Sequence, residues 1–258
     1  MESFVDSLAG KSIIVTGAAG GIGRAAALIL ARRGAVVTAV DVLSAEGEET
    51  VELIAAEGGK ASFAQVDVSS EDQVEALVQR VVSETGRLHG AFNNAGVEQT
   101  NMPLHLMPLE EWRRVNEVDL TGVFLCMKHE IAAMLNSGGG AIVNTASVLG
   151  EAGMPQAAAY IAAKHGVVGL TRAAATEYSK SGIRINTVMP GVIASPMFER
   201  HQDDPQYADQ IAAIIAAHPI GRPGRPEEIV EAAAWLLSDA ASFITGSAFA
   251  VDGGYLAQ

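Results

Sequence analysis

Short runs of β-branched and other apolar residues alternate along the chain with longer segments of helical periodicity. Six apolar runs are predicted to be strands, at residues 12–16, 36–40, 61–66, 91–93, 141–145 and 184–188. Four longer segments are predicted to be helices, at residues 22–33, 71–84, 109–135 and 157–181. Because the predicted strands are apolar almost throughout, we expect both of their faces to be buried, as in a parallel sheet covered by helices.

The regular alternation of strand and helix predicts an α/β fold with a doubly wound parallel sheet in three αβα layers. No linker or repeat interrupts it, so we expect residues 1–258 to form a single domain. Residues 193–226 differ because they contain five of the nine prolines, around a short helical piece at residues 206–217. We interpret this segment as a loop-and-helix insertion.

Composition narrows the class of protein. Hydrophobic residues make up 49% and charged residues 18%, which is typical of a well-filled globular domain. The formal net charge of −13 argues against nucleic acid and anionic membranes as partners. Cys126 is the single cysteine, no Cys/His spacing suggests a metal site, and we see neither a signal peptide nor a membrane-spanning run. These features predict a cytoplasmic protein without a metal.

A glycine-rich turn, TGAAGGIG at residues 16–23, leads from the first predicted strand directly into a helix. Gly17, Gly21 and Gly23 would allow a tight turn and the close approach of a pyrophosphate to the helix N-terminus, which Ile22 helps to form. A plain strand-to-helix turn is the alternative interpretation of such glycines when nothing else agrees.

Asp41 supports the nucleotide-binding interpretation, because it follows the second predicted strand 24 residues after Gly17 (41 − 17). A carboxylate there can accept hydrogen bonds from the adenosine ribose and would repel a 2′-phosphate. Neither Ala19 in the turn nor Val42 after the aspartate supplies a cation for such a phosphate. The sequence therefore favours NAD over NADP as the cofactor.

Tyr160 and Lys164 lie four residues apart in a predicted helix, so their side chains share one face. A lysine ammonium beside a phenol favours the phenolate, which makes the tyrosine a usable acid or base. Ser147 follows the fifth predicted strand, 13 residues before Tyr160 (160 − 147), and could reach a substrate oxygen across a cleft. Taken alone, Tyr-x-x-x-Lys is also common on surface helices.

Taken with further motifs, the chain resembles the short-chain dehydrogenase/reductase family over essentially its whole length. The shared motifs occur in the family's order and spacing: TGAAGGIG at 16–23, Asp67-Val68, Asn93-Asn94-Ala95-Gly96, Ser147, YIAAK at 160–164, Pro190-Gly191, and VDGG at 251–254. The resemblance implies a Rossmann fold and an enzyme that moves a hydride between NAD(H) and a secondary alcohol or its ketone.

The resemblance also implies roles for individual residues. In the cofactor site, Asp67 and Val68 would contact adenine, and Asn93, Ala95 and Gly96 would line the cofactor. Pro190, Gly191, Ile193 and Ser195 would lie at its nicotinamide end. In the catalytic site, Ser147 would polarise the substrate oxygen, Tyr160 would transfer the proton, and Lys164 would bind the nicotinamide ribose and ease deprotonation of Tyr160.

One position departs from the family pattern. The family has an asparagine in a motif like Asn-Leu-x-Gly-x-Phe, where it anchors a water-linked proton path to the lysine. This chain has Asp119-Leu120-Thr121-Gly122-Val123-Phe124 instead, and Asn116 is three residues too early to be the match. An aspartate cannot donate an amide hydrogen bond, although its backbone carbonyl could still hold water. We expect an active enzyme, with Asp119 as the questionable fourth member of the catalytic set.

The substrate pocket is predicted from Ser147, Met154 and Gln156 together with Met197 and Phe198 of the insertion. This mainly apolar lining suits a cyclic secondary alcohol or ketone better than a sugar or a charged acid. Two other functions stay open: a 3-oxoacyl carrier-protein reductase and a non-catalytic NAD-binding sensor. The two long predicted helices carry more apolar surface than one sheet face needs, and with the family resemblance this predicts a homotetramer.

Overall fold

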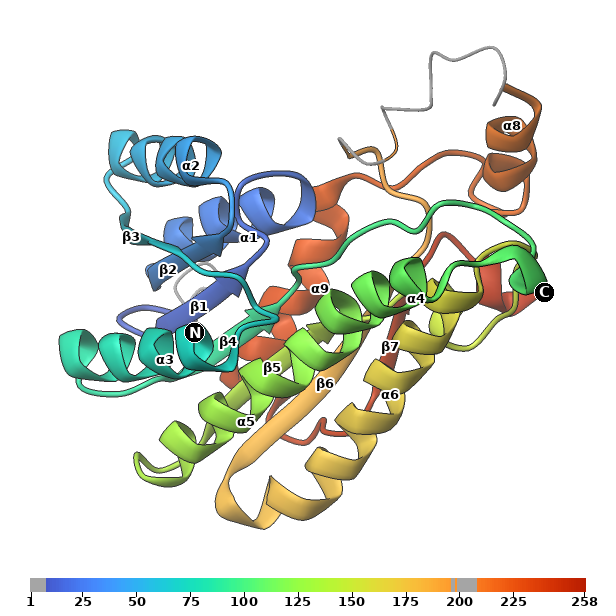
Figure 1. The fold of residues 1–258 in the computed structure, drawn as a ribbon. Coiled ribbons are helices and arrows are strands. Elements are labelled where there is room, and N and C mark those ends of the chain that lie inside the picture. Colours follow the sequence, from blue (N-terminus) through green and yellow to red (C-terminus); the bar gives the residue numbers. More distant parts are fainter. Residues whose placement is uncertain (1–7, 196–197, 199–207) are drawn as a thin grey trace.

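The computed structural model describes residues 8–195, 198 and 208–258, and its centre is a seven-stranded parallel sheet (Figure 1). The strands are β1 (Ser12–Thr16), β2 (Val36–Asp41), β3 (Lys60–Gln65), β4 (Gly90–Asn93), β5 (Gly140–Thr145), β6 (Ile183–Pro190) and β7 (Ala248–Val251). Their order in the sheet is β3-β2-β1-β4-β5-β6-β7. The chain therefore builds outward from β1 to β3 and then crosses to β4, which makes the carboxyl ends of β1 and β4 the switch point where ligands bind in such sheets.

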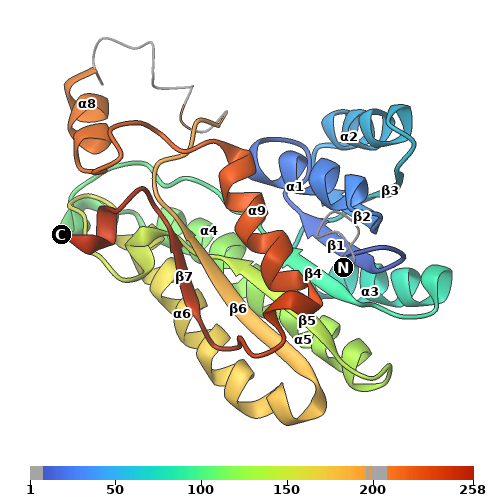
Figure 2. The same ribbon diagram turned by 180° about the vertical axis from the view of Figure 1, so that it is seen from behind.

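Helices cover both faces of this sheet, as the doubly wound prediction required (Figures 1 and 2). One layer contains α1 (Gly21–Arg32), α2 (Ser44–Ala56) and α9 (Pro226–Leu237). The other contains α3 (Glu71–Thr85), α4 (Leu109–Asn116), α5 (Gly122–Leu135) and α6 (Ala158–Tyr178). Along β1, Ile13 and Val15 pack into the core on the α1 and α9 side, whereas Ile14 packs on the α3, α5 and α6 side. Both faces of the strand are buried, which explains why three consecutive apolar residues form its centre.

All six predicted strands are confirmed, with boundaries that shift by at most two residues. Strand β7 and helices α2 and α9 were not among the predicted elements. β7 has only four residues, most of them half-buried, at the edge of the sheet. α2 is rich in glutamate and buries only Gly47, Thr50 and Ile54, so its apolar stripe is narrow. α9 starts at Pro226, the last residue of the stretch interpreted as a loop-and-helix insertion.

The predicted continuous helix at residues 109–135 is wrong in its middle. The chain forms α4, then a π-helical turn at Glu117–Thr121, and then α5. A π turn adds one residue to a helical turn and so rotates the side chains that follow, which apolar spacing does not reveal. This turn lies tightly against α6, since a Cβ on Gly166 would be 2.8 Å from Leu120 Cδ1. Asp119 is fully buried within the turn.

Two helix boundaries also differ from the prediction. The helix predicted at 157–181 ends as α6 at Tyr178 and continues as a 3₁₀ turn at Ser179–Ser181. The short helix predicted at 206–217 corresponds to α8 (Ala208–Ala216), while residues 206–207 lie outside the described part of the chain. Figure 2 shows α8 apart from both helical layers. Among the described helices, none is long and apolar enough to cross a membrane.

Candidate active site

The glycine-rich turn joins β1 to α1 at the switch point of the sheet. Gly17 and Gly21 have φ angles of +72° and +51°, which side chains other than glycine rarely adopt. A Cβ on Gly23 would lie 2.0 Å from the Gly17 carbonyl oxygen, so only glycine lets the helix start this close to the turn. Ile22, between them, is half-buried.

The N-terminus of α1 is built to receive an anion. No side chain caps it, and its first turn contains no acidic residue. The backbone amides at such an end carry partial positive charge and form hydrogen bonds with phosphate oxygens. The turn therefore fits the pyrophosphate of a dinucleotide.

Asp41 is the last residue of β2, and its carboxylate is oriented by two backbone amides. Oδ2 accepts a hydrogen bond from Ala19 N at 3.0 Å and Oδ1 accepts one from Leu43 N at 3.1 Å. These bonds fix a negative charge beside the glycine-rich turn and leave further lone pairs for a ligand's hydroxyl groups. Arg24, in the first turn of α1, pairs at 2.6 Å with Glu49, so its charge is already matched.

The segment after β4 is tied to the same turn. Thr16 Oγ1 accepts hydrogen bonds from Asn94 N at 2.9 Å and Ala95 N at 3.0 Å. Gly96 is exposed, and a Cβ there would lie 3.4 Å from Asp119 Oδ1 and 3.5 Å from Lys164 Nζ. The Asn93 side chain points instead into the core, where it is bound to Glu130 and Asn144.

Asp67 and Val68, the predicted adenine contacts, follow shortly after β3. The Asp67 carboxylate is exposed and accepts hydrogen bonds from Ser69 N at 2.9 Å and Ser69 Oγ at 2.6 Å. Val68 is buried, and a Cβ on Gly122 would be 2.8 Å from its Cγ2. The loop that carries both residues is therefore packed against the start of α5.

Tyr160 and Lys164 project from the first half of α6. Lys164 Nζ lies 5.4 Å from the centroid of the Tyr160 ring. It donates a hydrogen bond to Thr145 O at 3.2 Å, which ties α6 to the carboxyl end of β5. Lys164 is only 3% exposed, whereas Tyr160 is half-buried. The geometry matches a charged lysine held in place behind a more accessible phenol.

Ser147 lies two residues beyond Thr145, at the start of a 3₁₀ turn (Val148–Gly150). Its Oγ accepts a hydrogen bond from Leu149 N at 3.2 Å, and among the described residues none accepts its hydrogen, which can be donated to a ligand. This turn is packed on α6, since a Cβ on Gly150 would lie 3.1 Å from the Lys164 carbonyl oxygen. The fold thus brings the three predicted catalytic residues to one edge of the sheet.

Asp119 makes the strongest additional contact with this group. Its Oδ2 lies 3.6 Å from Lys164 Nζ, and its Oδ1 accepts a hydrogen bond from Val97 N at 2.7 Å. Burial lowers the pKa of Lys164, but Asp119 and Tyr160 more than offset this, so the net pKa is raised. Burial raises the pKa of Asp119, while the Lys164 ammonium and the Val97 amide oppose that rise. The lysine is therefore held in its charged form.

The predicted nicotinamide end follows β6, whose last residue is Pro190. Ile193 forms a bridge with Gly224, and Ala194 N donates to Gly224 O at 2.8 Å. The segment is held from behind by His218, whose Nε2 accepts a hydrogen bond from Val192 N at 3.1 Å. Ser195 is half-buried.

Gly191 is required by this packing, because a Cβ there would lie 2.5 Å from His218 Nε2. His218 Nδ1 lies 2.8 Å from Ile214 O, a carbonyl oxygen that can only accept, so Nδ1 is the donor in this hydrogen bond. His218 thereby joins α8 to the backbone just before Ile193.

Of the predicted substrate residues, Met154 and Phe198 are half-buried and Gln156 is exposed, while Met197 lies outside the described residues. Gln156 has a φ of +66°. Its carbonyl accepts a hydrogen bond from the Gln99 side chain, whose Oε1 accepts one from Tyr160 N at 2.9 Å. Gln99 therefore fixes the start of α6 and, with it, the position of Tyr160.

Sequence reasoning missed the supporting residues Thr16, Gln99 and His218. Each acts on a backbone group distant in the chain, with separations of 78, 61 and 26 residues. The sequence around each of these residues has no periodic pattern that points to such a contact, so only the three-dimensional structure reveals their role. Thr16 alone lies within a recognised motif.

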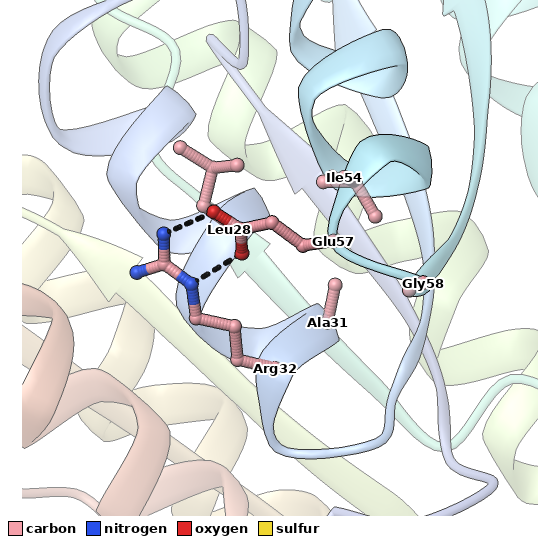
Figure 3. Close-up of a pocket in the computed structure, with 7 residues that line it drawn as sticks. Leu28, Ala31, Arg32, Ile54, Glu57 and Gly58 are labelled. Carbon is pink, nitrogen blue, oxygen red and sulfur yellow. Dashed lines mark hydrogen bonds and ion pairs between the residues drawn. The ribbon is translucent and has the colours of Figure 1, made fainter.

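Two cavities lie away from Tyr160. One of about 150 Å³ lies between α1 and α2 and is flanked by the hydrogen-bonded pair Arg32 and Glu57 (Figure 3). A second, of about 290 Å³, is lined by residues that include Ile193, His218 and Val251. Neither is lined by Ser147, Tyr160 or Lys164. In the described part of the chain no cluster of His, Cys, Asp and Glu could hold a metal ion.

Since the dinucleotide-type turn and the tyrosine–lysine pair occupy the same carboxyl edge of the sheet, fold and site together define a nicotinamide-dependent oxidoreductase. Comparison with known proteins then identifies the family. The chain belongs to the short-chain dehydrogenase/reductase family, and residues 17–256 match the family profile described as "Enoyl-(Acyl carrier protein) reductase".

Several relatives are similar over nearly the whole chain. A 2,5-dichloro-2,5-cyclohexadiene-1,4-diol dehydrogenase of Sphingobium indicum is 47% identical over 98% of this chain and 100% of its own. A cis-4-hydroxycyclohexanecarboxylate dehydrogenase of Sinomonas cyclohexanicum is 47% identical over 99% of both chains. Among solved structures, carveol dehydrogenase from Mycobacterium avium in complex with NAD has a TM-score of 0.93 and 32% identity, covering 98% of this chain and 100% of that one.

Proposed function

We propose that this protein oxidises an apolar, cyclic secondary alcohol to its ketone, or reduces the ketone, with NAD(H) and with Tyr160 as the proton-transfer residue. The observation that carries the proposal is the placement of Tyr160 against a buried, charged Lys164 beside the glycine-rich turn. The names of the relatives support a cyclic alcohol as substrate, because both relatives described above act on alcohols of six-membered rings. The apolar character of the substrate rests on the predicted lining alone, since the substrate named for the Sinomonas relative carries a carboxylate.

In alcohol oxidation, deprotonated Tyr160 takes the proton of the substrate hydroxyl group, and Ser147 orients the substrate oxygen by donating a hydrogen bond. Lys164 stabilises the phenolate by its charge and, as in the family, would contact the nicotinamide ribose. A dinucleotide held at the glycine-rich turn would supply the hydride chemistry, as acceptor in oxidation and as donor in reduction. Lys164 is buried and lies on the inner side of the site, whereas Gly96 is exposed to solvent.

For the cofactor, we propose NAD rather than NADP. Asp41 lies beside the turn with its charge fixed by Ala19 N and Leu43 N, and Arg24 is engaged by Glu49. Burying a 2′-phosphate beside this carboxylate would be unfavourable. The measurement is kcat/KM with each cofactor, and we expect a large preference for NAD. Equal efficiencies would remove the argument.

The cofactor-contact residues follow from the same placement. We propose Gly17, Gly21, Ile22 and Gly23 for the pyrophosphate side and Asp67 and Val68 for adenine. At the far end we propose Pro190, Gly191, Ile193 and Ser195. Ala95 and Gly96 would line the middle of the cofactor, while Asn93 would contribute only its backbone, because its side chain is bound in the core.

A 3-oxoacyl carrier-protein reductase is the second candidate. Such an enzyme must bind an acidic carrier protein, which a chain with a net charge of −13 would repel. A non-catalytic NAD sensor is the third, and Asp119 is the one feature in its favour. A panel of cyclic alcohols, terpenoid alcohols, steroids and acyl thioesters separates the three, because a sensor binds NAD without producing the absorbance of reduced nicotinamide.

Replacement of Tyr160 tests the mechanism directly. Tyr160→Phe keeps the ring but removes the proton acceptor, so turnover should fall by ~10²-fold or more while NAD binding is retained. Lys164→Ala should raise the dissociation constant of the cofactor as well as slow the reaction. Near wild-type turnover of Tyr160→Phe would falsify the assignment.

We further propose a cytoplasmic homotetramer built from single-domain subunits, in which residues 193–226 form an insertion beside the substrate. Support for assembly comes from the exposed apolar side chains Leu109, Trp112, Phe124 and Leu135 on α4 and α5. The free thiol of Cys126 is buried, which suits a reducing compartment without requiring one.

A further inference from the structure

The buried ammonium of Lys164 faces the carboxyl group of Asp119. Asp119 has no exposed surface, and its two oxygens have different partners. Oδ1 accepts the 2.7 Å hydrogen bond from Val97 N, whereas Oδ2 accepts none from the described part of the chain and lies 3.6 Å from Lys164 Nζ. The contact between Asp119 and Lys164 is therefore mainly electrostatic.

The other groups that act on this pair come from three directions. On α6, Tyr160 lies 5.4 Å from Lys164 Nζ, measured to the ring centroid. On α4, Arg114 acts on Asp119 through its charge, but it is paired at 2.9 Å with Glu111. From β5 only the neutral Thr145 carbonyl reaches Lys164.

The single lysine charge thus acts on two neighbours. Alone, a buried ammonium would favour the Tyr160 phenolate strongly. A carboxylate in direct contact offsets much of that charge, and in a buried site with little solvent screening the offset extends to the phenol. The π turn imposes this arrangement, since it directs Asp119 inward between the Val97 amide and Lys164.

We propose that Asp119 is a positioning residue that sets the working pH of the site: it keeps Lys164 charged and in place while moving the ionisation of Tyr160 to higher pH than a neutral residue would. The inference rests on the proposed role of Tyr160 in proton transfer. It predicts an enzyme suited to alcohol oxidation in alkaline solution.

Asp119→Asn is the direct test, because the variant keeps the shape and the oxygen that accepts from Val97 N but removes the charge. The pH profile of kcat for alcohol oxidation, at saturating NAD and alcohol, should keep its form. Its ascending limb should move to lower pH by about one unit, so that on the limb the variant turns over up to ~10-fold faster. The control is Asp239→Asn, which changes an exposed aspartate that is paired with Lys11. It should leave the ascending limb of the pH profile unchanged.

A second readout does not depend on turnover. The tyrosinate absorbance of the cofactor-free protein is titrated with and without Tyr160→Phe, and the difference isolates Tyr160 from the other three tyrosines. When both proteins also carry Asp119→Asn, the difference in tyrosinate absorbance should show Tyr160 ionising at lower pH, by about the same amount as the shift of the kinetic limb. If Asp119→Asn fails to fold, Asp119→Ser removes the same charge and keeps a hydroxyl that can accept from Val97 N.

Parallel downward shifts of the limb and of the tyrosinate titration support the inference. Unchanged or upward-shifted values in both neutral variants overturn it. If those values are unchanged while Tyr160→Phe is inactive, the proposed function survives and the role of Asp119 alone is rejected. An active Tyr160→Phe variant would instead reject the proposed function.

Discussion

Glu130 on α5 is a carboxyl group buried beneath the candidate site, with 1% of its surface exposed. Its Oε2 accepts a hydrogen bond from Asn93 Nδ2 at 3.0 Å. Burial raises its pKa to about 7 from an ordinary value of 4.5, and the Asn93 hydrogen bond only partly opposes this rise. At and above neutral pH the folded protein therefore contains a costly buried charge.

Glu130→Gln should stabilise the protein at alkaline pH and not at acidic pH. Because the folded pKa is the higher one, the native state binds more protons than the unfolded state between about pH 4.5 and 7. The free energy of unfolding of the wild type accordingly falls as the pH rises through that window. The variant should gain up to about 3 kcal/mol at pH ~8 and little at pH ~4.5, measured by urea unfolding. Glu48→Gln, at an exposed site on α2, is the control; an equal gain at both pH values would contradict the account.

Removal of Lys164 should reveal the charge of Asp119 in a different way. Lys164→Met leaves a buried carboxylate without its cation, which we expect to cost about 3 kcal/mol or more of unfolding free energy. Adding Asp119→Asn to that variant should restore part of the loss, since the uncompensated charge disappears and the Val97 hydrogen bond is kept. Urea unfolding of the single and double variants is the measurement. A double variant no more stable than Lys164→Met would show that Asp119 carries no destabilising charge once Lys164 is removed.

At the level of single residues, sequence predicted the groups with chemical signatures and not the groups that support them. Gly17, Asp41, Tyr160 and Lys164 occur in fixed spacings, so their meeting at one sheet edge could be anticipated. Asn93 was predicted at the cofactor, but its side chain lies in the core, because the last residue of a buried strand must place its side chain on one of two covered faces.

Among the elements, α8 and the segment after β6 are connected through one imidazole. His218 accepts a hydrogen bond from Val192 N, is bonded to Ile214 O, and lies 5.1 Å from the Tyr255 ring. Protonated His218 would present an N–H to the Val192 N–H and lose that bond. The contact requires the neutral form of the ring.

His218→Phe should weaken cofactor binding several-fold with little effect on the pH profile of kcat. The substituted ring keeps the packing on Tyr255 but cannot accept from Val192 N, so the segment before Ile193 loses its support. Fluorescence titration of NADH gives the dissociation constant for wild type and variant. Tyr255→Phe, which leaves the hydrogen bond to Val192 intact, is the control. Unchanged affinity for NADH in His218→Phe would show that the segment is held by other contacts.

The elements that could be predicted are those in which burial alone determines the pattern. β1, β4 and β5 are covered on both faces, and their short, mostly apolar runs identify them. The start of α9 could not be predicted, because it directly follows a proline-rich segment. The π turn between α4 and α5 depends on the packing of Leu120 against Gly166. Such tertiary contacts override local propensity and have no counterpart in the periodicity of one segment.

The whole molecule combines a large net negative charge with exposed apolar side chains, several of which lie on α4 and α5. Phe124 and Leu135 of α5 are each 46% exposed, and Leu109 of α4 is 53% exposed. Large apolar side chains gathered on one surface are typical of an interface between subunits. A net charge of −13 opposes association, so any stable assembly must bury enough apolar area to exceed that repulsion.

We expect light scattering at micromolar concentration to give the mass of a homotetramer, and Phe124→Asp to reduce it. In a two-fold interface each residue occurs once on each subunit, so one substitution places two carboxylates in the buried interface. The free-energy cost of burying a charge therefore counts twice. Leu53→Asp is the matched control, because Leu53 is 41% exposed on α2, in the opposite helical layer. Salt separates the two contributions: high salt should strengthen association of the wild type by screening the net charge, yet should not rescue Phe124→Asp, whose penalty is desolvation. A wild-type monomer, or equal effects of the two substitutions, would exclude this face of α5 as the interface.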